Sequence, residues 1–416
     1  MEHLRELHIL QSGIREIASS IGNLIGLRSY LYLNDCTNLR SLPRNICNMP
    51  SEYFDLSTNC PKLESSPPFS TGLQFLWGLS LSGTSVSEIP DWVFYLPDLY
   101  ELNLSRTMIR TIPASIKSSK LRTLHVSGCE SLQSLPELSL SIVKVDASGC
   151  TSLETVVNTS TLLTQEEPWK PWDHEDEYRE SFAFDDCLKL DQSNITTEFQ
   201  SRALRLAIRY SLRLKEMMVQ PTYHSYPEVV ISLAGDKIPT WFNHQNKEGR
   251  VINVNRPTYY HDSTNFMGFA SCVVVTRRNI EDAKTYDRPV PAFALNCDVH
   301  IIKKPATFCE KLVTFRKYIQ DIEAYGKNPV SSHMLMWHFK EVDSRYLSSA
   351  TEISFDFYPS KKYEIQLDVE VKKCGIHMLT LQDAEEFGII TNEPSGLEEI
   401  EKPRRTRTKS LFGIKK

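Results

Sequence analysis

The first 157 residues of the chain carry a periodic pattern that limits what they can fold into. Prolines stand at positions 43, 67, 90, 113 and 136, at intervals of 24, 23, 23 and 23 residues. The aliphatic frame before them is clearest in LYELNLSRTMIRTIP at 99–113 and LRTLHVSGCESLQSLP at 121–136. The frame occurs seven times, and its other copies are centred on Leu7, Leu31, Phe54, Leu79 and Val145. A fixed period of this kind predicts stacked, similar structural units.

The period lies within the range of about 20 to 29 residues that is typical of leucine-rich repeats. Each LxxLxL segment is then a short strand whose aliphatic side chains point into the coil. Cys36, Cys129 and Cys150 stand where such repeats bend inward, so we interpret them as structural thiols. The pattern predicts a leucine-rich-repeat solenoid of short parallel strands over residues 1–157, with about seven repeats.

The strands of such a solenoid form its concave face. The residue between the two inward aliphatic positions points to the opposite side, because successive strand side chains alternate. This predicts a column of outward side chains at His8, Tyr32, Asp55, Ser80, Asn103, His125 and Asp146. Neighbouring columns add Trp77, Tyr100 and Arg122. Because Trp, Tyr and Arg anchor many interfaces, we predict that this face binds a partner; a merely solubilising wall is the alternative.

The frame stops after Val156, and residues 158–180 carry seven acidic residues, two prolines and two tryptophans. This composition predicts a solvated acidic linker between domains. Trp169 and Trp172 are expected to cover the end of the solenoid, where the last coil would otherwise face water.

Residues 181–390 show a different pattern, with one amphipathic helix followed by β-rich runs. Phe199 and Ala203 share the apolar face of the helix, and Arg202 is expected on its opposite face. The predicted strands are 228–233, 250–254, 267–275, 292–302, 334–339, 351–357 and 363–371. Seven runs without alternating helices predict an antiparallel β-sandwich.

Composition and motifs argue against an enzymatic function. The ten cysteines form no CxxC pair, and the chain has no HExxH, GxSxG or Walker motif. We therefore expect no catalytic residue, no cofactor and no metal site. The net charge of -5 and the lack of a long apolar run make nucleic acid and membranes unexpected partners.

The last residues, 391–416, are predicted to be a basic disordered tail. Its segment KPRRTRTKSLFGIKK at 402–416 holds seven basic residues and no acid. A solvated tail is the favoured interpretation, and a nuclear address is the alternative. The expected location is the cytoplasm, with the nucleus left open by this segment.

Four motifs of the second half resemble a known domain. They are FAFDDCLKLD at 182–191, GDKIPTWFNHQ at 235–245, FMGFASCVVV at 266–275 and VKKCGIH at 371–377. Together with the LPxxI-style repeats, they resemble the C-terminal part of plant intracellular disease resistance proteins that begin with a Toll/interleukin-1-receptor (TIR) domain. The GxxIPxWFxHQ string is the most distinctive of the four, and the resemblance covers residues 1 to about 385.

The resemblance implies a C-terminal jelly-roll or immunoglobulin-like domain that works with the repeats to recognise a pathogen effector protein. The TIR domain and the nucleotide-binding switch of the family have no counterpart in these 416 residues. The family's NAD cleavage and nucleotide switching are therefore not expected of this chain. A truncated adaptor that pairs with a full-length TIR-type receptor is the alternative function.

Overall fold

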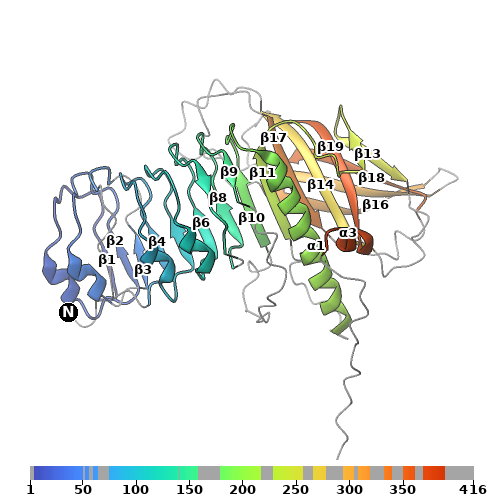
Figure 1. The fold of residues 1–416 in the computed structure, drawn as a ribbon. Helices are drawn as coiled ribbons and strands as arrows, with labels where there is room; N and C mark the ends of the chain where they lie inside the picture. Colours follow the sequence, from blue (N-terminus) through green and yellow to red (C-terminus); the bar gives the residue numbers. More distant parts are fainter. Residues whose placement is uncertain are drawn as a thin grey trace, which may run out of the picture.

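The computed structural model describes residues 4–49, 52–55, 60–63, 75–139, 141–157, 179–216, 228–255, 266–277, 294–303, 308–318, 332–339, 350–360 and 369–388. The predictions for the acidic stretch 158–178, with Trp169 and Trp172, and for the tail 391–416 lie outside these residues. Figure 1 shows a curved array of repeats that leads into a C-terminal part built mainly of longer strands.

The repeats form the predicted leucine-rich-repeat solenoid. Each contributes one strand to a parallel sheet, namely β1 (Glu6–His8), β2 (Tyr30–Tyr32), β3 (Tyr53–Asp55), β4 (Gly78–Ser80), β5 (Glu101–Asn103), β6 (Thr123–His125) and β8 (Lys144–Asp146). The opposite side carries 3-10 helices at η1 (Ser19–Asn23), η2 (Arg44–Asn48), η3 (Asp91–Tyr95) and η4 (Ala114–Ser118), and a small sheet of β7 (Ser134–Leu135) and β9 (Thr155–Val156). Short strands facing a side of tight helices give the array its curvature.

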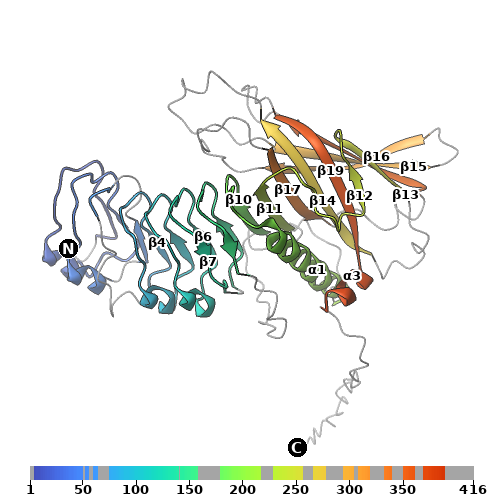
Figure 2. The ribbon, with the colours of Figure 1, turned by 45° about the horizontal axis from the view of Figure 1, so that its top comes forward.

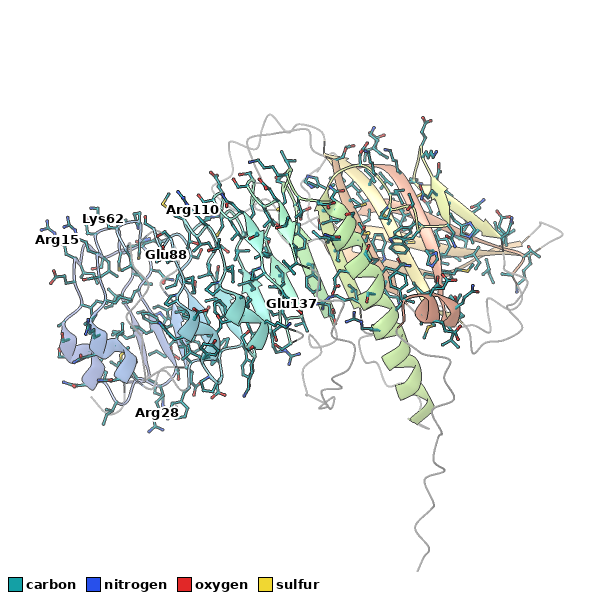
Figure 3. The ribbon with its side chains drawn as sticks, in the orientation of Figure 1. Arg15, Arg28, Lys62, Glu88, Arg110 and Glu137 are labelled. Atoms are coloured by element: carbon teal, nitrogen blue, oxygen red, sulfur yellow. The ribbon has the colours of Figure 1, made fainter. Side chains whose placement is uncertain are left out.

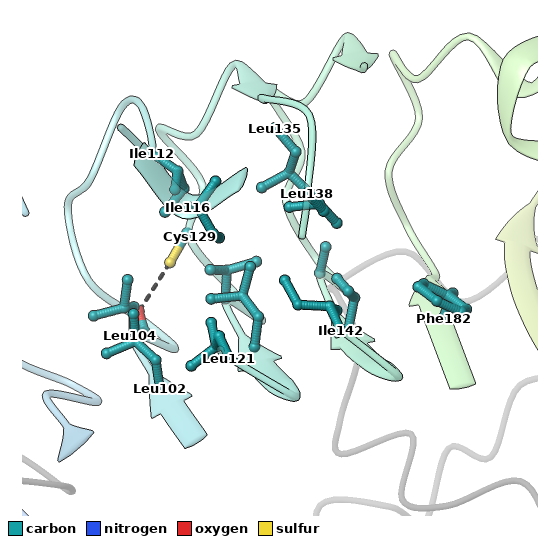
Figure 4. Packing of buried hydrophobic residues seen from close by; sticks show 14 of the residues in the cluster. Leu102, Leu104, Ile112, Ile116, Leu121, Cys129, Leu135, Leu138, Ile142 and Phe182 are labelled. Carbon is teal, nitrogen blue, oxygen red and sulfur yellow. Dashed lines mark hydrogen bonds between the residues drawn. The ribbon is translucent and has the colours of Figure 1, made fainter. Parts of the chain in front are cut away.

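Six of the repeats turn after their strand through one residue in the left-handed region, and the turn of the third repeat lies outside the described residues. These residues have φ between 51° and 73° and are Gln11, Asp35, Gly83, Arg106, Gly128 and Gly149. After five of these six residues the next residue is buried and donates a hydrogen bond to a carbonyl of the coil. The Cys129 thiol, for example, donates to the Leu104 carbonyl over 3.0 Å (Figure 4). Burial raises the pKa of the Cys129 thiol. These cysteines are therefore hydrogen-bonded structural groups, as predicted.

The parallel sheet continues past the predicted end of the repeats. β10 (Arg179–Phe184) pairs with β8 in parallel, with Phe182 opposite Val145. Asp186 takes the left-handed conformation at φ 57°, and the Cys187 thiol donates to the Ala147 carbonyl over 3.1 Å. Burial raises the pKa of that thiol to about 12.

Residues 182–190 are thus an eighth turn of the repeat frame, Phe-x-Phe-x-x-Cys-x-x-Leu, with phenylalanine in place of leucine. Phe182, Phe184 and Leu190 belong to the same buried cluster as the repeat leucines. Figure 4 shows Phe182 beyond Ile142 at the end of that core. The sequence pattern had placed this segment in the C-terminal domain, because the stretch 158–178 interrupts the period.

The sheet then runs on into the C-terminal part. β11 (Glu228–Ala234) is parallel to β10 and antiparallel to β17 (Ser332–Phe339). β14 (Phe266–Arg277), β19 (Val369–Thr380) and β12 (His244–Asn246) follow β17 in the sheet. Within the described residues this sheet has 13 strands. The first sheet of this part is therefore mixed, whereas the sequence analysis expected purely antiparallel pairing.

A second, four-stranded antiparallel sheet has the order β13 (Val251–Asn255), β18 (Glu352–Ser360), β15 (Ala294–Lys303) and β16 (Phe308–Tyr318). Its inward side chains share a buried cluster with those of β14, β17 and β19, including Phe269, Trp337, Phe355 and Phe357. Each predicted strand overlaps an observed one, although only the end of 363–371 coincides with β19 and residues 363–368 lie outside the described part. β10, β12 and β16 were not predicted.

Helix α1 (Gln192–Glu216) packs on β11, β14 and β17, as Figure 2 shows. Phe199 and Ala203 are buried as predicted, but Arg202 is buried as well. Its guanidinium pairs with Glu180 at 2.7 Å and Glu198 at 2.8 Å, and lies 4.5 Å from the centroid of the Phe182 ring. Arg202 was expected on the polar face of the helix, but the Glu180 and Phe182 side chains of β10 lie against its guanidinium and help to bury it. In the described chain no helix is both long and apolar enough to span a bilayer.

The eighth turn gives a stability prediction. Phe184→Ala removes a ring that is 2% exposed in the shared core, so it should lower the free energy of unfolding by about 3–5 kcal/mol in chemical denaturation. Leu188→Ala, four residues on at a side chain that is 63% exposed, is the matched control and should change it by less than about 0.5 kcal/mol. Equal effects of the two substitutions would contradict the eighth turn.

Candidate partner-binding face

The predicted column lies in one row across the repeat sheet. The register places His8 beside Tyr32, then Asp55, Ser80, Asn103, His125 and Asp146. The middle residue of each strand points into the core, as the buried Leu31, Leu102 and Leu124 show. Alternation along the strands therefore produces the row that the sequence pattern indicated.

A second row runs parallel to the first, two residues earlier in each strand. Its members are Glu6, Tyr30, Tyr53, Gly78, Glu101, Thr123 and Lys144. The sequence analysis passed over Tyr30 and Tyr53, although the alternation that selects Tyr32 also selects the residue two positions before it. Trp77, Tyr100 and Arg122 directly precede the second row in their repeats.

Five rings from four successive strand regions contact one another on this face, and we call them the aromatic ladder: His8, Tyr30, Tyr32, Tyr53 and Trp77. The ring centroids of His8 and Tyr32 are 4.5 Å apart and those of Tyr30 and Tyr32 are 5.5 Å apart. Tyr53 joins Tyr30 at 5.9 Å and Trp77 at 4.8 Å. Aromatic pairs at such separations contribute about 0.5–1.5 kcal/mol beyond area burial, so the ladder is held together by its own contacts.

Gly78 makes room for the ladder. A Cβ atom at position 78 would lie 2.2 Å from Cδ2 of Tyr53. The Tyr53 ring therefore rests on the backbone of the next strand, and any other residue at 78 would displace it.

The other predicted residues differ in their exposure to solvent and in their hydrogen bonds. Tyr100 is 41% exposed, whereas Ser80 is only 2% exposed and cannot meet a partner without rearrangement. The Asn103 side chain accepts a hydrogen bond from the Ser105 amide at 3.0 Å, and Asp146 accepts one from the Ser148 amide at 3.1 Å. Both side chains thus also stabilise the turn of their own repeat. The side chain of Asp55 lies outside the described part of the structure.

The last repeats have a different character from the ladder. Arg122, His125 and Lys144 lie there, and burial together with Lys144 lowers the pKa of His125 although Asp146 raises it. His125 is therefore neutral at neutral pH. The face changes from aromatic in the first four repeats to polar and cationic in the sixth and seventh.

The described residues contain no cluster of three or more His, Cys, Asp or Glu side chains placed to hold a metal ion. The buried histidines serve the fold: His333 Nδ1 lies 3.3 Å from Asp185 Oδ1, a carboxylate that also accepts a hydrogen bond from Ser232. His377 Nε2 lies 2.9 Å from Asp383 Oδ1. The first pair links the eighth repeat turn to β17, and the second links β19 to the residues that follow it.

The apolar residues of the GxxIPxWFxHQ segment, Ile238, Trp241 and Phe242, pack against the core. Phe242 is 1% exposed, and Trp241 lies 3.9 Å from it and 6.1 Å from Phe199 of α1 between ring centroids. Gln245 Nε2 donates to the Phe242 carbonyl over 3.0 Å and closes the turn. A Cβ at Gly375 would lie 3.0 Å from Ile238 Cγ2. The turn therefore packs against both α1, through Trp241 and Phe199, and β19, through Ile238 and Gly375.

Known proteins share sequence with both parts of this structure. Residues 233–385 match the C-JID domain, and the chain is similar to the C-terminal part of plant disease resistance proteins of the TIR, nucleotide-binding and leucine-rich-repeat type. This similarity covers the repeats and the C-JID domain together.

Particular relatives make the similarity concrete. Disease resistance-like protein DSC1 of Arabidopsis thaliana is 27% identical over 371 residues, which are 84% of this chain and 28% of that protein. Protein SUPPRESSOR OF npr1-1, CONSTITUTIVE 1 of the same plant is 37% identical over 162 residues, 38% of this chain and 11% of that protein. The chain spans about a quarter of the length of the first curated relatives it matches. Among solved structures, the leucine-rich repeat domain of the type III effector XopL aligns with 47% of this chain and 66% of its own, at 21% identity and a TM-score of 0.37.

The His377–Asp383 pair predicts a pH dependence. Burial raises the pKa of Asp383, but hydrogen bonds from His377 and Thr380 outweigh it and the pKa is lowered overall. A carboxyl whose pKa is lower in the folded state contributes stability above its unfolded pKa of about 3.9, and this is lost as pH falls through the folded pKa. Asp383→Asn should therefore lower the unfolding free energy at pH 7 by about 1–3 kcal/mol and flatten its acid dependence. A variant as stable as the parent at pH 7, with the same acid profile, would contradict this role.

Proposed function

We propose that this chain is the ligand-sensing portion of a plant intracellular immune receptor and that it recognises a pathogen effector protein. The proposal is supported by the similarity to disease resistance proteins over both the repeats and the C-JID domain. The proposed binding face comprises the predicted residues of the repeat strands, with Tyr30 and Tyr53 added and with Ser80 as a buried support.

The observation that carries the proposal is the continuity of the sheet. The concave strands connect through β10 and β11 to β17, β14, β19 and β12 without a break in hydrogen bonding. An effector that contacts the repeats can therefore also meet strands of the C-terminal domain, which the same sheet holds in fixed register. Two surfaces on one framework recognise a folded protein with little ordering cost, because preorganisation reduces the entropy lost on binding.

We further propose that the two sheets of the C-terminal domain are a jelly-roll or immunoglobulin-like sandwich. The support is that both sheets line one buried cluster. In this proposal the domain begins at α1, since β10 completes the repeat sheet. The domain has a binding and capping role, in the cytoplasm, and no catalytic one.

A binding experiment with paired substitutions tests the function. A panel of pathogen effectors and full-length TIR-type receptors is presented side by side to the immobilised chain. An effector that binds the parent chain should lose at least about tenfold in affinity with Trp77→Ala and Tyr100→Ala combined, because buried aromatic anchors contribute about 2 kcal/mol or more.

Tyr95→Ala is the matched control, since Tyr95 is an aromatic residue 65% exposed on the opposite side, in η3. It should leave affinity unchanged. Capture of receptors but of no effector would overturn the proposal in favour of the adaptor function. If an effector still binds the doubly substituted chain with the parent affinity, the concave face is not the surface that binds it.

A further inference from the structure

The aromatic ladder occupies only one end of the concave face, which suggests a specialised part of the surface. Its rings belong to β1, β2 and β3 or immediately precede β4. These strands are hydrogen-bonded to one another, and Gly78 sets the position of the Tyr53 ring. The ring positions are therefore fixed before any partner arrives, so little conformational entropy is lost when they make contact.

Carboxylates flank the ladder on the same strands. Glu6 and Glu52 are exposed. Glu6 stands two residues before His8, and Glu52 directly precedes Tyr53. Arg5 is exposed beside Glu6. Other cations of these repeats, such as Arg15, Lys62 and Arg28, lie along the two edges of the array (Figure 3). Arg122 stands in the sixth repeat and Lys144 in the seventh, and Asp146 is the one acid of the outward column in these two repeats, so the cations of the strand face gather at the end opposite the ladder.

We infer that the aromatic ladder binds a basic segment of the protein partner, one that presents arginine or lysine side chains to the rings. The inference rests on the proposed function and adds the chemistry of the partner. Cations are attracted to the faces of Trp and Tyr rings, and Glu6 and Glu52 supply complementary charge that favours encounter with a basic surface. An acidic or nucleic-acid segment would be repelled at the same place.

The charge gradient also orients the partner. Its basic segment lies over the first four repeats, and the part that meets Arg122 and Lys144 is neutral or acidic. Like charges opposite one another disfavour the reversed orientation.

A peptide titration of the full chain tests the inference. The probe is a fluorescently labelled 15-residue peptide of alternating Arg and Ser, and the comparison peptide carries citrulline, which is neutral and of the same shape, at every Arg position. Anisotropy should show at least about tenfold tighter binding of the Arg peptide. Trp77→Ala and Tyr53→Ala should each weaken that binding by about 2- to 30-fold, the range expected of cation–π contacts.

Matched variants separate the ladder from general charge attraction. Gly78→Ala keeps every ring but displaces Tyr53, and it should weaken binding while the chain stays folded in circular dichroism. The double variant Glu6→Gln with Glu52→Gln should bind the Arg peptide more weakly than the parent chain at low salt, whereas Lys144→Gln should not weaken this binding. The Glu pair leaves the core untouched, so it remains informative if a ring variant misfolds.

Binding of the Arg peptide that is unchanged by the ring and Glu variants would overturn the inference, as would equal binding of the citrulline peptide or no binding of either peptide. These results are distinct from failure of the proposed function. An effector retained by the parent chain and lost with Trp77→Ala and Tyr100→Ala would still support effector recognition, with a ladder that serves another chemistry.

Discussion

A leucine-rich-repeat solenoid ends in an open coil whose core would face water unless something covers it. Here the covering group is β10, which hydrogen-bonds to the last repeat as though it were another repeat strand. The Ser181 amide donates to the Val143 carbonyl over 2.8 Å, and the Ala147 amide donates to the Ala183 carbonyl over 2.8 Å. The rest of the structure depends on this pairing, because β10 is also the strand on which β11 and the C-terminal sheets are built.

Buried charges fix the register at this junction. Arg202 of α1 reaches Glu180 of β10 inside the fold, and Asp185, just past β10, is bonded to Ser232 of β11 and lies beside His333 of β17. Removing one partner of a buried pair commonly costs about 3–5 kcal/mol, since the other charge is left uncompensated. Such pairs tolerate few alternative alignments of helix and strands. The repeats and the C-JID domain consequently form one framework, which would hold the proposed partner-binding face.

The sequence was sufficient for the repeats because their proline and leucine spacing is local. Each outward position follows from alternation, as Tyr32 and His125 show. It was insufficient where a role depends on contacts distant in sequence. Phe182 and Cys187 complete a repeat only because they return to β8 after a long interruption, and Arg202 is buried only because β10 lies over it. Ser80 keeps the outward place in its strand yet is shielded, which no periodicity can reveal. β12, which has only three residues, and β16 lie at the sheet edges and likewise lack a clear alternating pattern.

The continuity of the sheet is tested most directly by hydrogen–deuterium exchange, resolved to single amides, on the full chain. The amides of Ala147 and Ser181, which cross between β8 and β10, should exchange as slowly as the Leu104 amide, which is bonded to the His125 carbonyl within the repeats. Slow exchange at all three amides is expected of one cooperative sheet. Exchange at Ala147 and Ser181 that is orders of magnitude faster than at Leu104 would contradict it, and would mean that the repeats and the C-terminal domain open independently.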